Sequence, residues 1–156
     1  MCTVTYLIRS HDIILTSNRD IPIKRPHSKP PKIYNFNSKN ILLPLDPFGK
    51  GSWIGTNGSE IICLLNHKGE QKGVQSRGLL INEILSGELD INGLNTNCKK
   101  YNPFKLIYLN KSKNIFYEIT WNTKKFTMDK ITGSVKIWSS TSIYSDEQIK
   151  NKENYF

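Results

Sequence analysis

The apolar residues of this chain occur in short runs bounded by turn-forming residues, and this pattern restricts the fold more than any other feature. The clearest case joins residues 52–57 (SWIGTN) to residues 60–66 (EIICLLN) around Asn57-Gly58. Asn-Gly is the pair favoured in tight hairpin turns, because both residues tolerate positive φ. The pattern therefore predicts antiparallel strands that follow one another through short turns.

Further strands and two helices follow from the same criteria. Aliphatic residues at helical spacing after Ser76, with Gly87 near their end, predict a helix, and a capping pattern at Ser145 predicts another. Together these elements indicate an α+β fold. The first strand pair, at residues 3–8 and 12–17, is expected to be a largely buried hairpin. The other strands are expected at residues 52–57, 60–66, 104–110, 114–121, 124–128 and 134–140, and the helices at residues 76–88 and 145–156.

Residues 22–50 form a proline-rich segment in which many of the remaining residues are polar. Proline removes a backbone donor and interrupts helices, so we expect an extended, irregular segment rather than a helix. Long segments of this kind often form the walls of functional sites. The aromatic residues Tyr34, Phe36 and Phe48 are therefore expected to line an apolar pocket.

Size and composition limit the classes of function. The 156 residues are enough for one domain with its own core, so a single domain over residues 1–156 is expected. The net charge of +9 comes from scattered lysines without a basic stripe, which argues against a nucleic-acid partner. No apolar run is long enough for a signal peptide or a stable membrane insertion.

Three cysteines without C-x-x-C spacing predict neither a disulfide framework nor a metal site, so we expect a cytoplasmic protein without a cofactor. Cys63 lies in an apolar run and is expected in the core. Cys98 lies in a polar linker and is expected to be an incidental surface thiol.

Cys2 follows the initiator methionine directly, at a position where a structural thiol is unusual. Removal of Met1 would leave Cys2 with a thiol nucleophile and an α-amine base on one residue, since the α-amine has a reference pKa of about 7.7–8.0. The antiparallel hairpin returns Arg19 and Asp20 to its side. Arg19 is expected to stabilise the thiolate and Asp20 to orient the α-amine, although a structural Arg-Asp pair would have the same pattern.

Six motifs, in order from Met1 to Phe156, closely resemble the NRDE proteins, also called the transport-and-Golgi-organisation family. That family in turn is similar to the N-terminal nucleophile hydrolases on the choloylglycine hydrolase and penicillin V acylase side. The resemblance implies an αββα sandwich of antiparallel sheets. NRDE proteins usually continue well beyond this chain, so the domain is expected to be incomplete at its C-terminus. The motifs are MCTVTY, ILTSNRD, DPFGKGSWIGTN, CLLNHKG, QSRGLL and WSSTSIYSDE.

The resemblance implies roles for individual residues. Cys2 matches the nucleophile, Arg19 and Asp20 match the flanking charged pair, and the backbone amide of Asn66 matches an oxyanion donor. Candidate substrate-binding residues are Asn18, Trp53 and Asn57, and Asn57 is also a candidate oxyanion donor. Turn and packing roles are nevertheless favoured over a catalytic role for four motif residues, Trp53, Asn57, Ser76 and Arg77. The chain departs from the pattern at Ile21, where the family has Glu, and at residues 139–141 (SST), where the hydrolases have a second oxyanion Asn.

Two functions from different classes follow. The first is an N-terminal cysteine amidohydrolase or acylase that acts on a non-peptide linear amide or acyl bond of a small molecule. The second is a non-catalytic carrier or trafficking protein for an apolar ligand such as haem or lipid, for which His11, His27, His67 and the free thiols are candidate axial ligands. The sequence indicates no oligomeric state.

Overall fold

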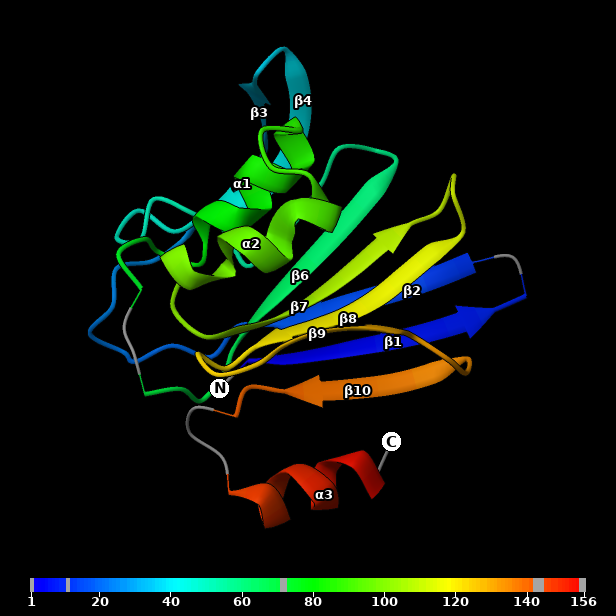
Figure 1. Cartoon of the computed structure of the whole chain (residues 1–156). Coiled ribbons are helices and arrows are strands. Elements are labelled where there is room, and N and C mark those ends of the chain that lie inside the picture. The colour runs from blue at the N-terminus through cyan, green and yellow to red at the C-terminus, as the bar shows by residue number, and fades with distance from the viewer. Residues whose placement is uncertain (1, 11, 71–72, 142–144, 155–156) are drawn as a thin grey trace.

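Ten strands form two antiparallel sheets in the computed structural model, which describes residues 2–10, 12–70, 73–141 and 145–154 (Figure 1). The three-stranded sheet has the order β10-β1-β2, and the seven-stranded sheet runs from β3 to β9 in chain order. The α+β prediction is confirmed. The strands are β1 (Thr3–Arg9), β2 (Asp12–Asn18), β3 (Lys29–Phe36), β4 (Lys39–Leu45), β5 (Ile54–Thr56), β6 (Glu60–Asn66), β7 (Phe104–Asn110), β8 (Ile115–Trp121), β9 (Phe126–Lys130) and β10 (Val135–Ser139).

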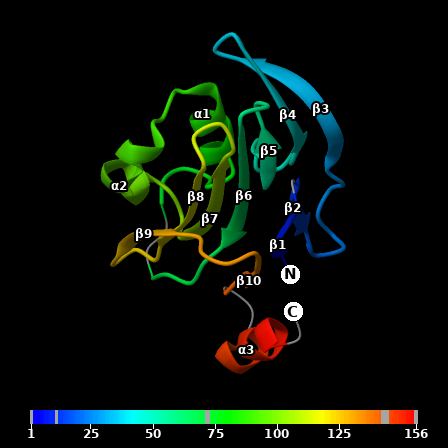
Figure 2. The same cartoon turned by 90° about the vertical axis from the view of Figure 1, so that its right-hand side faces the viewer.

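Helices α1 and α2 and the smaller sheet lie on opposite faces of the seven-stranded sheet, as the two views show (Figures 1 and 2). α1 and α2 cover one face, the three-stranded sheet covers the other, and α3 lies beside β10. The helices are α1 (Leu79–Ser86), α2 (Leu94–Asn97) and α3 (Asp146–Asn154), and short 3-10 turns at Ile91–Gly93 and Cys98–Lys100 flank α2.

Strand β6 explains how one apolar run serves two cores. Because side chains alternate between the faces of a strand, Ile62 and Leu64 pack in the cluster under α1, whereas Cys63 and Leu65 pack between the two sheets. A strand covered on both faces is apolar along its whole length rather than at alternate positions. The predicted core position of Cys63 is confirmed, since its side chain is fully buried.

The first hairpin is confirmed, but its second strand is less buried than expected. β1 pairs with β2 from Thr3 with Asn18 to Arg9 with Asp12, and β10 pairs along the other side of β1. β2 is therefore an edge strand, and alternate side chains along it are exposed, such as Ile14 at 42%. The register places Asn18 opposite the residue that follows Cys2.

The prediction of an extended segment without a helix at residues 22–50 is confirmed, but the segment is not irregular throughout, because β3 and β4 form a hairpin there. β3 is an edge strand, and edge strands tolerate proline because the missing donor faces away from the sheet. The register also shifts between Lys29 and Lys32, where the two prolines of β3 lie. Tyr34 and Phe36 pack on the core below α1, Phe48 is 74% exposed, and none of the three lines the pocket near Cys2.

The predicted first helix is shorter than expected, whereas the linker that follows it is more helical than expected. α1 begins at Leu79, three residues after Ser76, and ends at Gly87, whose φ of +79° closes the helix in the left-handed conformation. The following linker contains α2 and its flanking 3-10 turns. Cys98 lies in this part and is 1% exposed, so its prediction as a surface thiol is wrong. Its burial follows from the helical turn, which directs the thiol into the core below α1.

A charged network ties the two sheets together between β8 and β10. The Glu118 carboxylate accepts from Lys105 Nζ on β7 at 2.5 Å, and from Lys136 Nζ at 2.8 Å and Trp138 Nε1 at 2.7 Å on β10. Burial alone would raise the pKa of Glu118, but the two lysines and the indole donor outweigh it and bring the pKa to about 2.

Acid is therefore expected to weaken the fold through Glu118. The folded pKa lies below the ordinary value of 4.5, so this contribution is complete above about pH 4.5 and is lost as the pH falls towards about 2. Urea unfolding at several pH values should show about 2 kcal/mol less stability at the acidic end. Glu118→Gln should lack this part of the acid dependence, and parallel pH profiles for the two proteins would contradict the assignment.

Candidate functional site

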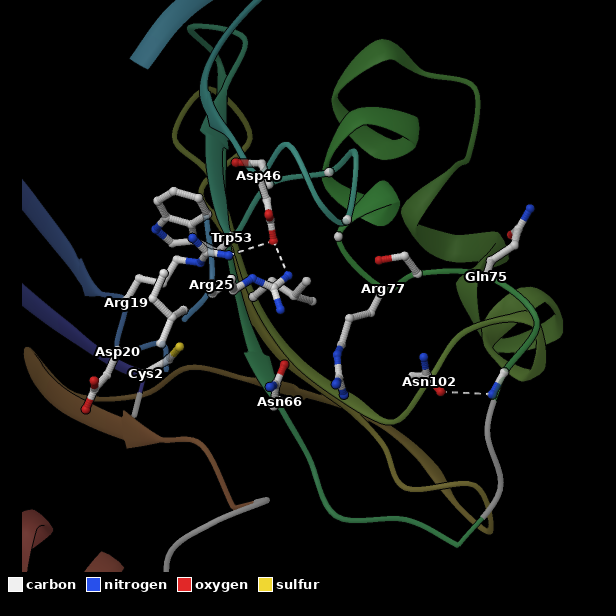
Figure 3. Close-up of a pocket in the computed structure, with 18 of the residues that line it drawn as sticks. Cys2, Arg19, Asp20, Arg25, Asp46, Trp53, Asn66, Gln75, Arg77 and Asn102 are labelled. Atoms are coloured by element: carbon white, nitrogen blue, oxygen red, sulfur yellow. Dashed lines mark hydrogen bonds and ion pairs between the residues drawn. The ribbon is translucent and has the colours of Figure 1, made fainter. Parts of the chain in front are cut away.

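A pocket of about 440 Å³ lies near the N-terminus, where strands β2 and β6 end and several loops meet (Figure 3). Six parts of the chain that are distant in sequence contribute to its wall. Predicted site residues from four motifs meet there. The lining residues are Cys2, Arg19, Asp20, Ile21, Pro22, Arg25, Asp46, Gly49, Gly51, Ser52, Trp53, Leu64, Asn66, Gly73, Val74, Gln75, Ser76, Arg77, Gly78 and Asn102.

Cys2 precedes β1 at the pocket edge, between the ends of the two strands that pair with β1, which are β2 and β10. The β1–β2 register brings Arg19 beside it, and the backbone amide of Ser140, just after β10, donates to the Cys2 carbonyl at 3.0 Å. Burial raises the pKa of the Cys2 thiol, while the charges of Arg19 and Arg77 lower it, and burial has the larger effect. A thiol with a raised pKa is mostly protonated near neutral pH.

Two arginines share one carboxylate on the pocket wall. Asp46 accepts from Arg19 Nη2 at 2.6 Å and from Arg25 Nη2. Arg19 also donates to Ser28 Oγ at 2.5 Å, and its guanidinium lies 4.1 Å from the centre of the Trp53 ring. The arginine contacts keep the pKa of Asp46 below its usual value although burial alone would raise it. Arg19 is thus fixed in place beside Cys2.

Asn66 is the last residue of β6, and Figure 3 shows its side chain in the pocket with Cys2. Its backbone carbonyl accepts from Ser140 Oγ at 3.0 Å and from the Thr141 amide at 3.2 Å. The segment after β10 therefore holds both Cys2 and Asn66 through backbone bonds. Ser140 and Thr141 thus connect these two strand ends.

A close contact of two glycines brings the remaining wall into position. A Cβ on Gly51 would lie 2.3 Å from the carbonyl carbon of Gly78, so only glycine permits this approach. Next to the contact, the Ser52 amide donates to the Gly78 carbonyl at 3.0 Å. This packing places Arg77 in the pocket, where Nη1 donates to the Pro103 carbonyl.

The structure gathers most of the predicted site residues and separates two of them. Cys2, Arg19, Asp20, Trp53 and Asn66 line the pocket, and Figure 3 shows Asp20 beside Cys2. The other two lie elsewhere: Asn18 is exposed at the end of β2, and Asn57 stabilises the β5–β6 turn, with its side-chain oxygen accepting from the Glu60 amide at 2.9 Å.

Sequence reasoning missed the polar residues that complete the wall. Asp46 and Arg77 lie in two of the recognised motifs, so the motifs marked them, but their partners could not be inferred from spacing. Arg25 and Asn102 lie outside every motif, so no feature of the sequence indicates that they belong to the site. Asn102 Oδ1 accepts from the Gly73 amide at 3.0 Å and thereby shapes the far side of the pocket.

Of the candidate axial ligands, Cys2 lines the pocket, whereas the described histidines His27 and His67 do not. His67 is half-buried, with Nδ1 at 2.9 Å from the Lys68 carbonyl, and burial lowers its pKa; His27 is exposed. His11 lies outside the described residues. Among the described residues, no three His, Cys, Asp or Glu side chains gather as a metal site would require. None of the described helices has the length and apolar character to cross a bilayer.

The fold and pocket define an α+β protein of two antiparallel sheets, with a cysteine near its N-terminus in an arginine-rich pocket. Comparison with family models matches residues 1–154 to Transport and Golgi organisation 2. The chain belongs to this family, which confirms its resemblance to the transport-and-Golgi-organisation proteins. The comparisons find no match among curated proteins or solved structures.

Proposed function

We propose that this protein is an N-terminal cysteine amidohydrolase or acylase that cleaves a linear amide or related acyl bond, with an αββα fold of the N-terminal nucleophile type. The observation that carries the proposal is the position of Cys2 in a pocket it shares with Arg19, Asp20 and Asn66. The layer order, helices then two sheets with α3 beside β10, agrees with such a fold.

The α-amine of Cys2 supplies the base that the protonated thiol requires. After removal of Met1, this amine is partly neutral near neutral pH and takes the thiol proton directly or through a water molecule. The thiolate attacks the acyl carbon and the carbon–nitrogen bond breaks. The amine leaves with the proton, and water then hydrolyses the thioester to the acid and regenerates the thiol.

Arg19 and Asn66 have distinct roles in this reaction. Arg19 favours the thiolate by its charge, which Asp46 and Trp53 hold in place. In β6, the Leu64 amide donates to the Trp53 carbonyl at 2.8 Å, and amides two residues apart project from the same edge of a strand. The Asn66 amide therefore projects towards the pocket beyond the start of β5, where it would donate to the oxyanion.

Intact-mass analysis of the full chain after brief incubation with p-nitrophenyl acetate tests the proposal. We expect loss of Met1, one acetyl group on Cys2, continued release of p-nitrophenol, and none of these acyl reactions in Cys2→Ala. Cys98→Ala is the matched control and should retain the adduct, because Cys98 is buried away from the pocket.

Retention of Met1, or an adduct that persists in Cys2→Ala, would contradict the hydrolase proposal. Carriage of an apolar ligand does not need a free Cys2 amine, so ligand binding that is unchanged in Cys2→Ala would then favour the carrier. Acetylation without continued release of p-nitrophenol would also contradict turnover, since the thioester must be hydrolysed in each cycle.

A further inference from the structure

Arg77 is a pocket arginine that the proposed chemistry does not use. It lies between Ser76 and Gly78, immediately before α1, and Figure 3 shows its side chain extending towards Asn66 and Asn102. The Gly51–Gly78 contact fixes its backbone, and the bond from Nη1 to the Pro103 carbonyl fixes its guanidinium. The group is thus held in one place before any ligand binds.

The charges around Arg77 differ from those around the other two arginines of the pocket. Arg19 and Arg25 share the Asp46 carboxylate. Within the described part of the chain, no carboxylate pairs with Arg77. Burial lowers the pKa of Arg77, and a thiolate at Cys2 opposes this effect when it forms. A half-buried guanidinium remains charged. Because no carboxylate of the described residues neutralises it, its charge and its remaining N–H donors can bind a ligand.

We infer that Arg77 binds an anionic group, a carboxylate or a phosphate, that lies close to the scissile bond of the amide attacked by Cys2. This inference rests on the proposed function for the identity of the reacting bond. The guanidinium matches the planar pair of oxygen atoms on such a group, and Arg77 and Cys2 line the same pocket. The substrate class is then an N-acylated amino acid or a similar short anionic amide.

Alkylation of Cys2 by two reagents of different charge tests this inference. Iodoacetate carries a carboxylate and iodoacetamide does not, and both react with the same thiolate. The ratio of their rate constants therefore cancels any change in the thiol pKa. We expect Arg77→Gln to lower the iodoacetate-to-iodoacetamide ratio about tenfold, the loss of one hydrogen-bonded charge contact. An unchanged ratio would overturn the inference.

Two further variants separate binding from general charge effects and from misfolding. Arg77→Lys keeps the cation and should retain most of the ratio. Arg9→Gln removes the same charge from an exposed position at the end of β1 and should leave the ratio unchanged. Equal decreases in Arg77→Gln and Arg9→Gln would show a nonspecific effect of net charge and would overturn the inference.

Protection of Cys2 in the unaltered protein identifies the anion. N-acetylglycine and N-acetylethanolamine phosphate should slow iodoacetamide alkylation more than the neutral N-acetylglycinamide does, and the better of the two shows whether carboxylate or phosphate is preferred. No difference from the neutral amide would overturn the inference. Alkylation does not require acyl turnover, so the two proposals can fail separately. A ratio that depends on Arg77, without an acetyl adduct on Cys2, would reject only the hydrolase proposal. An acetyl adduct with an unchanged ratio would reject only the anion site.

Discussion

Asp46→Asn is expected to lower the free energy of unfolding by roughly 3 kcal/mol, because it leaves two arginine side chains without their shared counter-charge. The Asp46 and Arg19 side chains are 10% and 12% exposed, so solvent screens this interaction little. Asparagine keeps the size of the side chain, and the loss therefore reports charge rather than packing. Urea unfolding at neutral pH measures it.

The same variant should impair the site and change the acid response. Without Asp46, Arg19 is no longer held beside Cys2, and acetylation of Cys2 should slow. The pKa of Asp46 is lowered in the folded protein, so its contribution is present above the ordinary carboxyl pKa and is lost as the pH falls below it. Asp129→Asn is the matched control, since Asp129 is exposed on β9. Equal stability losses in the two variants would refute the arginine clamp.

Gly51→Ala is expected to cost about 3 kcal/mol or more, because a methyl group has no space at the contact with Gly78. The added Cβ would lie 2.3 Å and 2.5 Å from the carbonyl carbon and oxygen of Gly78, and backbone atoms cannot move aside as a flexible side chain does. The two segments must separate, which also withdraws Arg77 from the pocket. Thermal unfolding and Cys2 alkylation should both change.

Gly93→Ala provides the comparison for this effect. Gly93 has φ of −84°, which alanine adopts readily, and a Cβ there would have nothing within 4 Å. Alanine also restricts the unfolded chain, so this variant should be unchanged or slightly stabilised. A Gly51→Ala protein as stable as Gly93→Ala would show that the glycine contact does not assemble the site.

The elements predicted best are those whose pattern is set within a few residues. The β5–β6 hairpin followed from Asn57-Gly58, and Gly58 does adopt a positive φ of +94°. The prolines of residues 22–50 predict an extended segment without a helix, but they do not show that it pairs as the β3–β4 hairpin, because a strand tolerates proline only where it lies at an edge. Edge position is a property of the whole sheet. It could not be inferred from residues 22–50 alone.

The candidate site divides in the same way. Arg19 and Asp20 could be placed beside Cys2 because one short hairpin sets their relation. Asp46 and Arg77 join them only through contacts between distant loops, and no local periodicity encodes such contacts. Cys98 shows the same limit, since its polar neighbours indicated exposure while a short helical turn buried it.

The pairing of β1 with β10 has a consequence for the order of events during synthesis. It joins Thr3 to Ser139, and the next residue, Ser140, holds the Cys2 carbonyl. The ribosome must therefore synthesise the residues up to Ser139 before the N-terminal strand acquires its second neighbour. Contacts between such distant residues also form slowly. The proposed removal of Met1 thus belongs to the earlier interval, when the nascent N-terminus is still accessible to an aminopeptidase and the pocket has not closed around the cysteine.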